Sequence, residues 1–426
     1  MLALNDALSA LAAHPRAVPW RLRMHSGWSG AAMVRDYRIF APALVRSVHP
    51  VLARAHNTIL LLNPAAAELH PPPDAPSLEP AISNIRSVHR IGLFLPGEMV
   101  RPLPRGDLPG VDDAGAVAFG PGVAAGLDIG GTGMKACVVR DGALVRMASA
   151  PTWPSGVYGI DSLVQRARAL IHEVAGGESI GSLGIGLAAP MGVGGRVLEL
   201  STVLRERVGT VEAFDGFARL VSDGLVHGPV AIFNDLSNLG RHLSALGRRR
   251  LVRLQIGTSF GGCWIDTNGE VYATEMGRLV VDVGPDAIAH TYLPLKGAMR
   301  AYLSNLGAAL AIERQTGSRP DVERAGHALR ALLDSGDPAA QRVLDQMADA
   351  LVGVIHELNA ILPGVTAVEC GGSMLQGPTG RGIHRRVSGR VPVEFRISAN
   401  PGHDGAIAAA QAPRVVAPLK GFRRVS

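Results

Sequence analysis

Hydrophobic and polar positions follow a repeating pattern from about residue 121 onwards. Apolar runs of strand length, such as "VAAGLDI" (123–129) and "KACVV" (135–139), flank a turn rich in glycine. Strands are then predicted to alternate with helices along the next hundred residues. The predicted strands lie at 143–149, 183–189 and 230–233, and the predicted helices near 160–176 and 212–225.

The same pattern begins again at "LVRLQIGTSFGGCWID" (251–266). Further strands are predicted at 270–274 and 366–370, and helices near 297–313, 321–334, 338–361 and 404–412. Two strand-rich openings, each followed by helices, predict an α/β protein with two lobes built on one plan.

The first 120 residues differ in composition, because they contain 14 of the 29 prolines. The stretch "HPPPDAPSLEP" (70–80) is typical of a polyproline spacer. Residues 29–56 are expected to carry one or two helices, and residues 91–104 a short strand pair. We therefore expect an N-terminal accessory segment or lid of unknown role over residues 1–120. The other predicted units are a first lobe at 121–245 completed by the helix at 404–412, a second lobe at 246–403 and a tail at 413–426.

The composition also indicates where in the cell the protein is expected. The chain is 47% hydrophobic and 18% charged, as ordinary globular proteins are, and its plain apolar runs fall short of the ~20 residues that span a bilayer. The start "MLALNDALSALAAHPR" lacks the basic residues of a signal peptide. Cys137, Cys263 and Cys370 lie in strand-like apolar contexts, which is typical of a reducing compartment. We expect a cytoplasmic protein with no membrane contact.

The net charge of +6 comes almost entirely from arginine, since lysine occurs only at positions 135, 296 and 420. Small basic clusters lie at 247–253 and in the C-terminal tail. We interpret them as solvated faces, and the alternative is a footprint for a polyanion. No nucleic-acid partner is expected.

The glycine-rich turns carry the candidate chemistry. In "GLDIGGTGMK", Asp128 ends a strand and the glycines form a tight turn where backbone N–H groups can approach phosphate. The segment "IGTSFGG" repeats this arrangement in the second lobe. One such turn is usually a plain hairpin, but two turns from separate lobes would face each other across a cleft and could bind a polyphosphate from both sides.

Two further strand ends carry polar groups. "FNDLSNLG" places Asn234 and Asp235 where a strand ends and a helix begins, a position where either residue could serve only as a helix N-cap. "AVECGGSM" ends a buried strand in Gly-Gly-Ser before another predicted helix.

The order of these motifs resembles that of the ROK family of sugar kinases and sugar-responsive repressors, within the actin, hexokinase and Hsp70 ATPase superfamily. The resemblance covers residues 123–412. It also includes "LGIGLAAPMGVGG", "TEMGR" and "KGAMRAYLSNLGAAL". It implies an α/β fold with two RNase H-like, actin-like ATPase lobes around a central cleft, and a homodimer is expected.

The resemblance also implies roles for individual residues in a reaction that uses ATP and Mg²⁺. Asp235 would be the general base, Asn234 would orient the attacking hydroxyl, and Asp128 would hold Mg²⁺ through water. Lys135 either contacts phosphate or points into solvent. The implied phosphate-binding residues are Asp128, Gly130, Gly131, Thr132, Lys135, Gly257 and Thr258. The implied nucleoside-binding residues are Gly371, Gly372 and Ser373.

The chain departs from the family pattern on the acceptor side. The cysteine-rich zinc loop is missing from residues 279–296, so no zinc site is expected. Arg278 stands where the family has the histidine of G-E-x-G-H, although Glu275 is kept, and Arg300 replaces a glutamate. These three residues are candidate acceptor-binding residues. The arginines either pair with carboxylates of the protein or select an anionic acceptor.

The leading hypothesis is an ATP-dependent kinase acting on a hydroxyl of a sugar, cyclitol or related polyol. The alternative is a ROK-type sugar-sensing transcriptional regulator without kinase activity, although residues 1–120 show no helix-turn-helix pattern. In a third possibility, compatible with the first, the N-terminal segment contributes acceptor specificity or a dimer contact.

Overall fold

A computed structural model gives the architecture of the chain. It describes residues 3–13, 18–25, 32–39, 50–62, 66–70, 92–94, 122–153, 157–189, 197, 200, 202–274, 276–289, 295–362 and 364–411. The predicted polyproline spacer, apart from its first residue, and the predicted C-terminal tail lie outside these ranges.

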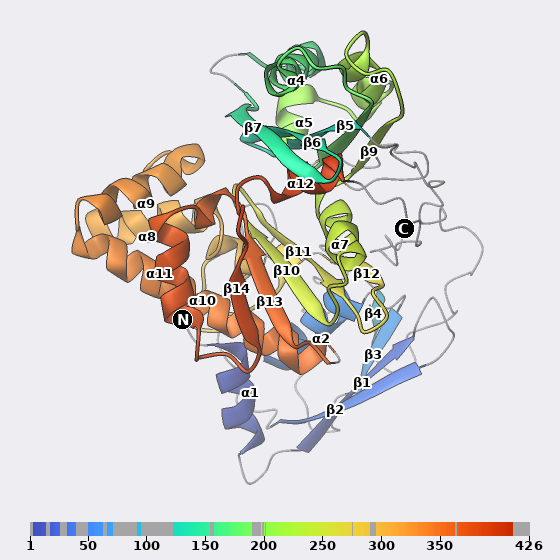
Figure 1. Ribbon diagram of the computed structural model, residues 1–426. Coiled ribbons are helices and arrows are strands. Elements are labelled where there is room, and N and C mark those ends of the chain that lie inside the picture. The colour runs from blue at the N-terminus through green and yellow to red at the C-terminus, as the bar shows by residue number, and fades with distance from the viewer. Residues whose placement is uncertain are drawn as a thin grey trace.

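The first lobe, called lobe 1, is built on a mixed sheet with the strand order β7-β6-β5-β8-β9 (Figure 1). Its strands are β5 (Val123–Ile129), β6 (Gly133–Arg140), β7 (Ala143–Pro151), β8 (Ser182–Leu187) and β9 (Val230–Asn234). β5, β6 and β7 pair antiparallel, whereas β8 and β9 continue the sheet in parallel with β5.

Lobe 2 repeats this plan with the strand order β12-β11-β10-β13-β14. Its strands are β10 (Leu251–Ile256), β11 (Phe260–Ile265), β12 (Val271–Thr274), β13 (Ala367–Gly371) and β14 (Glu394–Ile397). The antiparallel and parallel pairings fall at the same places as in lobe 1. The predicted duplication of one α/β plan is therefore confirmed.

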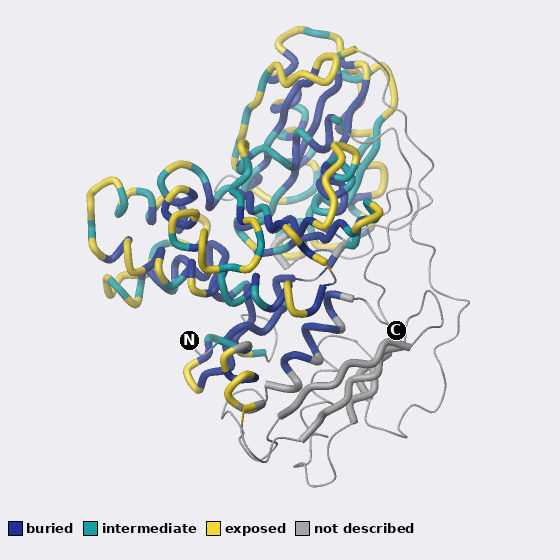
Figure 2. Tube along the Cα trace, turned by 60° about the horizontal axis from the view of Figure 1, so that its bottom comes forward, coloured by how far each residue is buried: buried dark blue, intermediate teal, exposed yellow. Residues whose placement is uncertain are grey.

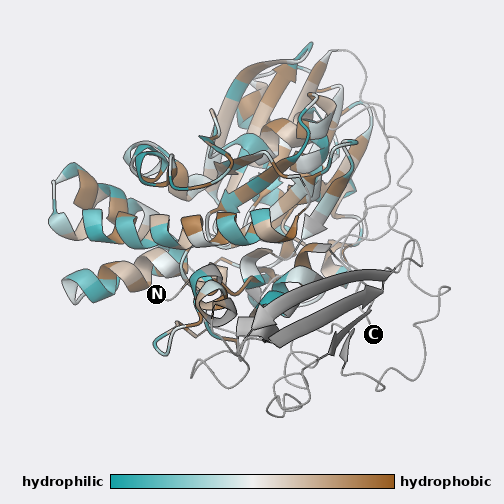
Figure 3. Ribbon diagram, turned by 90° about the horizontal axis from the view of Figure 1, so that it is seen from below, coloured by the Kyte–Doolittle hydropathy of each residue, from teal (hydrophilic) through white to brown (hydrophobic). Residues whose placement is uncertain are grey.

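Helices cover both faces of each sheet. In lobe 1, α4 (Ile160–Ala175) and α6 (Phe217–Ser222) contribute to the core on one face, and α12 (Asp404–Ala410) packs on the other. The other described helices of the two lobes are α5 (Thr202–Val208), α7 (Asp235–Ala245), α8 (Asn305–Thr316), α9 (Ala325–Asp334), α10 (Pro338–Ile361) and α11 (Pro378–Val387). Figure 2 shows that the central strands of the two lobe sheets are largely buried, and Figure 3 shows that many helices combine polar and apolar positions.

Two glycines let α12 approach the lobe 1 sheet very closely. A Cβ atom at Gly126 would overlap the carbonyl oxygen of Ala406, and one at Gly184 would overlap that of Ala409. Side chains alternate between the faces of a strand, so Asp128 points to the same face of β5 as Gly126. The carboxylate of Asp128 therefore faces α12.

α7 and α12 lie between the two sheets (Figure 1). Leu239 and Leu243 of α7 pack in one buried cluster with Leu251 of lobe 2 and Ala408 of α12. These two helices therefore connect the lobes through apolar contacts.

The N-terminal segment is joined to lobe 2. It contains α1 (Leu4–Ala12), α2 (Pro50–Leu62) and a sheet of β1 (Val18–His25), β2 (Ala32–Ile39), β3 (Ala66–His70) and β4 (Gly92–Phe94). Leu60 and Leu61 of α2 are fully buried in the core of lobe 2. Asn57 donates to the carbonyl of Val280 at 2.7 Å and accepts from its N–H at 2.8 Å. α2 is thus part of the lobe 2 core.

Several predicted elements are corrected by the structure. Residues 32–39 form strand β2 where only helices were expected. Of the strand pair predicted at 91–104, residues 92–94 form strand β4, and the other residues lie outside the described ranges. The predicted helix at 212–225 is split because Gly216 adopts a left-handed conformation with φ 72°.

Helix α8 begins only at Asn305, because Ser304 is its N-cap and accepts from Gly307. The prediction at 321–334 begins as a short 3₁₀ turn at Val322–Arg324. α10 matches its predicted range, and α5 and β14 were not predicted.

Candidate active site

The two glycine-rich turns meet at the junction of the lobes. Thr132 in the β5–β6 turn and Thr258 in the β10–β11 turn share a hydrogen bond of 2.5 Å between their hydroxyl oxygens. Thr152 supports the first turn by donating its hydroxyl to the Gly130 carbonyl at 2.8 Å. The structure therefore brings the two predicted phosphate loops together.

The first glycine of each turn, Gly130 or Gly257, donates its backbone N–H to a carbonyl of the same turn. The Gly130 N–H donates to Gly133 at 3.1 Å, and the Gly257 N–H donates to Ser259 at 3.0 Å. Within the described residues, the backbone N–H groups at 131, 132 and 258 have no backbone acceptor. These three amides, rather than those of Gly130 and Gly257, are left as donors for an anion.

Asp128 lies beside these turns in a confined position. Its side chain is almost completely buried, and Lys135 Nζ lies 3.8 Å from Asp128 Oδ2. A Cβ atom at Gly405 would lie 2.7 Å from Asp128 Cγ, and one at Gly186 would lie 3.7 Å from Asp128 Oδ1. Lys135 therefore faces the site, and the absence of a side chain at Gly405 leaves room for the carboxylate.

Asp235 is the first residue of α7 and lies on the other side of Gly186. A Cβ atom at Gly186 would lie 3.6 Å from the Asp235 Cα. Burial raises the pKa of Asp235 to about 7, and the negative charge of Asp128 adds to this shift. The Leu236 N–H donates to Asp235 Oδ1 at 2.9 Å, and this hydrogen bond lowers the pKa of Asp235 and so offsets part of the rise. The two predicted carboxylates therefore lie on either side of one glycine.

Asn234 is engaged by the protein. Its Oδ1 accepts from the Ser237 N–H at 2.9 Å, which makes it the N-cap of α7. Its Nδ2 donates to the Ala189 carbonyl at 3.1 Å and to Asp235 Oδ1 at 3.2 Å. Asn234 thereby fixes the orientation of the Asp235 carboxylate, and its contact with an acceptor hydroxyl stays a prediction.

The Gly-Gly-Ser turn after β13 lies against the second phosphate loop. A Cβ atom at Gly257 would lie 3.4 Å from Ser373 Oγ, and one at Gly372 would overlap the Ile256 carbonyl. Gly372 also has φ 105°, which side chains rarely adopt. The structure therefore places the predicted nucleoside turn, Gly371, Gly372 and Ser373, next to Gly257.

The predicted acceptor side is only partly described. Glu275 lies outside the described residues, and so does most of the loop after β8. Arg278 and Arg300 lie in two short 3₁₀ turns that contact each other. Burial lowers the pKa of His56 in α2 to about 4, and the positive charge of Arg278 contributes to this shift. Arg278 therefore lies close to the N-terminal segment, which the sequence did not indicate.

No group of three or more His, Cys, Asp or Glu side chains among the described residues is arranged to hold a metal ion. His290, the single histidine in residues 279–296, lies outside the described ranges. No helix in the described ranges has the length and apolar character needed to cross a bilayer. The three cysteines are buried and free, as predicted.

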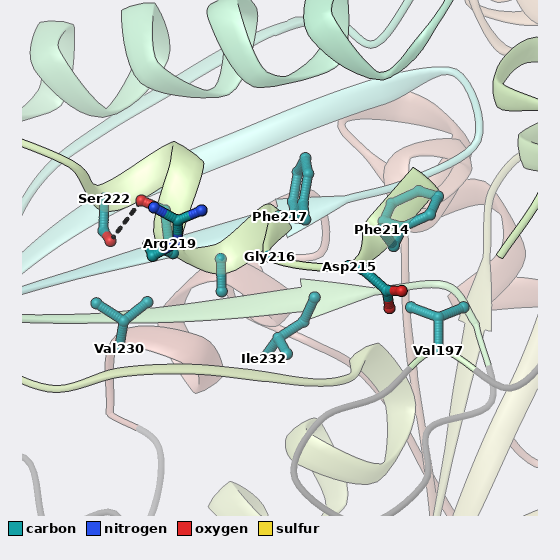
Figure 4. Close-up of a pocket in the computed structure, with 10 residues that line it drawn as sticks. Val197, Phe214, Asp215, Gly216, Phe217, Arg219, Ser222, Val230 and Ile232 are labelled. Carbon is teal, nitrogen blue, oxygen red and sulfur yellow. Dashed lines mark hydrogen bonds between the residues drawn. The ribbon is translucent and has the colours of Figure 1, made fainter. Parts of the chain in front are cut away.

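A separate pocket of about 530 Å³ lies in lobe 1 between α6 and β9. Figure 4 shows Val230 and Ile232 of β9 on one side, with Phe214 and Phe217 above them. Side chains two residues apart share a face of a strand, so Asn234 follows these residues on the same face. None of the predicted site residues lines this pocket.

The sequence did not single out Gly186 and Gly405, and the interpretation of the basic cluster at 247–253 as a solvated face is wrong for Arg253, which is fully buried. The two glycines matter only because segments distant in sequence approach them. Arg253 is a fully buried arginine on the largely apolar strand "LVRLQI". A charged residue in a buried strand was the one signal that could have drawn attention to it.

No protein-family model matches the sequence, and no curated protein matches it. The structure is similar to that of the Lmo2764 protein from Listeria monocytogenes, named as a candidate N-acetylmannosamine kinase. The TM-score is 0.50 at 19% identity, over 68% of this chain and 97% of that chain.

Two further solved structures are similar at TM-scores of 0.49. One is a ROK family glucokinase from Streptomyces griseus in complex with glucose and AMPPNP, 20% identical over 69% of this chain and 99% of that one. The other is a ROK family transcriptional regulator homologous to Escherichia coli MLC, 15% identical over 68% and 78%. Together with the two repeated sheets, the Listeria structure establishes the fold. The chain therefore has the predicted fold of two actin-like ATPase lobes, which it shares with the Listeria protein.

Proposed function

We propose that the protein is an ATP-dependent kinase that transfers the γ-phosphoryl group to a hydroxyl of a sugar, cyclitol or related polyol. The observation that carries this proposal is the meeting of both glycine turns, joined by Thr132 and Thr258, beside two carboxylates. Phosphoryl transfer needs positioning and neutralisation of charge more than covalent chemistry, and this arrangement offers both.

The residues fit a magnesium nucleotide. Mg²⁺ keeps several waters and takes one or two carboxylates together with substrate phosphates, so a large set of protein ligands is not required. Asp128 would hold Mg²⁺, through water. The amides at 131, 132 and 258 would bind phosphate oxygens, and Lys135 would add a positive charge. When bound, ATP supplies the phosphoryl group.

Asp235 would accept the proton of the attacking hydroxyl. A base works best with a pKa near the working pH, and burial raises the pKa of Asp235 to about 7. Asn234 and the Leu236 N–H both bind Asp235 Oδ1. Its other oxygen, Oδ2, would therefore face the acceptor.

The acceptor class rests on the fold and on two arginines. The Streptomyces protein of the same fold was solved with glucose and AMPPNP, which favours a sugar-like acceptor and ATP here. Arg278 and Arg300 would favour an acceptor carrying a carboxylate or phosphate, with Glu275 accepting from a remaining hydroxyl. A coupled ADP-release screen across neutral, amino and acidic sugars and cyclitols would identify it.

Further parts of the proposal concern the whole protein. We propose the domain boundaries given above, a cytoplasmic location and a homodimer. No sequence-selective binding to DNA is expected. A gel shift with genomic fragments that showed such binding, from a protein without turnover of ATP, would favour the regulator instead.

The base is tested by Asp235→Asn, which keeps the shape of the side chain but removes the proton acceptor. We expect turnover to fall by about 10²–10⁴, while the Kd for nucleotide stays within about threefold of the wild-type value. Asp349→Asn, at an exposed carboxylate paired with Arg390, is the matched control and should retain full turnover. Full activity of Asp235→Asn would show that the base is assigned wrongly.

A further inference from the structure

Arg253 is a buried charge that links three parts of the molecule. Its side chain is fully buried on β10, and its Nη1 donates to Glu369 Oε1 of β13 at 2.9 Å. Its Nη2 binds Asp404 Oδ2, at the first residue of α12, and also reaches Gln255 Oε1 at 3.3 Å. In the described part of the chain, its Nε has no hydrogen-bond partner.

Helix α12 is held by both lobes. Its body packs on the lobe 1 sheet over Gly126 and Gly184. Its first residue, Asp404, is bound by two lobe 2 residues, because Ser398 also donates to Asp404 Oδ1 at 2.8 Å. The position of this end of α12 is therefore set by lobe 2.

The same arginine touches the predicted nucleoside turn. A Cβ atom at Gly371 would overlap Arg253 Nη2 and lie 2.7 Å from Asp404 Oδ2. The next residue, Gly405, lies against the Asp128 carboxylate. A Cβ atom at Gly405 would lie 2.7 Å from Asp128 Cγ. A continuous set of contacts therefore runs from Gly371 through Arg253 and α12 to Asp128.

Stability alone does not explain a charge in this place. Burying an arginine carries a desolvation cost that its ion pairs often only offset, and apolar residues of similar volume are frequently as stable or more so. The Nε of Arg253, buried without a partner, adds to that cost. What an apolar side chain could not provide is the directed contact with Asp404.

We propose that Arg253 is a positioning residue that, through Asp404, fixes the N-terminal end of α12 and so holds the Asp128 carboxylate in register with the nucleoside turn. This inference rests on the proposed function, in which Asp128 serves the metal. It predicts that Arg253 affects nucleotide binding mainly when Mg²⁺ is present, although it touches neither ligand.

The test compares the Kd of a fluorescent ADP analogue with and without Mg²⁺. The variants are Arg253→Met, Arg253→Lys, Asp404→Asn and the double variant Arg253→Met with Asp404→Asn. We expect Arg253→Met and Asp404→Asn each to weaken binding with Mg²⁺ by about tenfold, and binding without it by less than about threefold. The double variant should be no weaker than either single variant, because both remove the same link.

Arg390→Met is the matched control, because Arg390 forms an exposed ion pair with Asp349. It should leave both Kd values unchanged. If Arg253→Met does not fold, Arg253→Lys and Asp404→Asn carry the test. With Mg²⁺, Arg253→Lys should bind the ADP analogue more tightly than Arg253→Met but less tightly than wild type. The lysine ammonium can still reach Asp404, but it cannot bind Glu369 at the same time.

The outcomes separate this inference from the proposed function. Suppose that the wild-type protein binds the nucleotide. If the variants then weaken binding equally with and without Mg²⁺, or if their Kd values equal those of Arg390→Met, Arg253 has only a structural role and the inference fails. If the wild-type protein binds no nucleotide under either condition, the proposed function fails, and the inference fails with it.

Discussion

Glycines determine where the charged groups of this site can lie. Gly405 leaves space for the Asp128 carboxylate, Gly371 leaves space for the Arg253 guanidinium, and Gly186 separates Asp128 from Asp235. Each of these contacts joins residues that are distant in sequence. A methyl group at Gly405 or Gly371 would displace a charged side chain or a helix end, whereas one at Gly186 would only make contacts of 3.6 and 3.7 Å.

Gly405→Ala should show this effect on catalysis. Its Cβ would lie 2.7 Å from Asp128 Cγ, so either the carboxylate or α12 must move. We expect kcat with Mg²⁺ and ATP to fall by about 10²-fold, the scale of an ångström-sized misplacement in an active site. The control is Gly353→Ala in α10, where nothing lies within 4 Å. Wild-type kcat for Gly405→Ala would contradict the placement of Asp128 in the reaction.

Local motifs explain which site residues could be predicted. Asp128, at the end of β5, and Thr132 and Thr258, in the two turns, belong to short motifs whose chemistry is visible in a few letters, and the structure brings the two turns together. Arg253 and Gly405 could not be predicted, because their importance depends on partners about 150 and 280 positions away, respectively. Roles for Arg278 and Arg300 stay predictions.

Helix α2 behaves as an element of lobe 2. Asn57 binds both backbone groups of Val280 and donates to Glu357 at 3.0 Å, and Arg54 pairs with Glu357 through two bonds of 2.8 Å. These contacts hold Val280, in the segment 279–296 that lacks the cysteine-rich loop of the family pattern. Strand and helix periods predicted the two lobes, but they could not show that an N-terminal helix fills the lobe 2 core, because this pairing is not local.

His56 gives α2 a measurable pH dependence. Its folded-state pKa of about 4 lies below the unfolded value of 6.5, because burial disfavours the charged ring. The unfolded chain therefore binds more protons between pH 6.5 and 4, so the stability contributed by neutral His56 is present above pH 6.5 and is lost as pH falls. The loss should approach roughly 3 kcal/mol near pH 4.

Urea unfolding of wild type and His56→Gln at pH 7, 6, 5 and 4.5 would measure this effect. The difference in unfolding free energy between the two should narrow as pH falls. His227→Gln, at an exposed histidine, should keep a constant difference from wild type. A constant difference for His56→Gln as well would show that His56 is not buried as described.

At the scale of the whole molecule, the candidate active site lies at the junction of two similar lobes. α7 and α12 connect the sheets, the hydroxyls of Thr132 and Thr258 join the turns, and Arg253 binds α12 to lobe 2. In this fold, binding of both ligands is expected to close the lobes and exclude water from the transferred phosphoryl group. The repeated pattern of strands made this arrangement predictable, because each half follows the same order.

A crystal structure with Mg²⁺ and AMPPNP would test whether the two turns bind one nucleotide. We predict that the phosphates lie between the amides of residues 131 and 132 on one side and 258 on the other, with Mg²⁺ and its waters next to Asp128 and the nucleoside beside Gly372. A nucleotide bound elsewhere, or a triphosphate held by only one of the two turns with Asp235 remote from its γ-phosphate, would contradict the proposal.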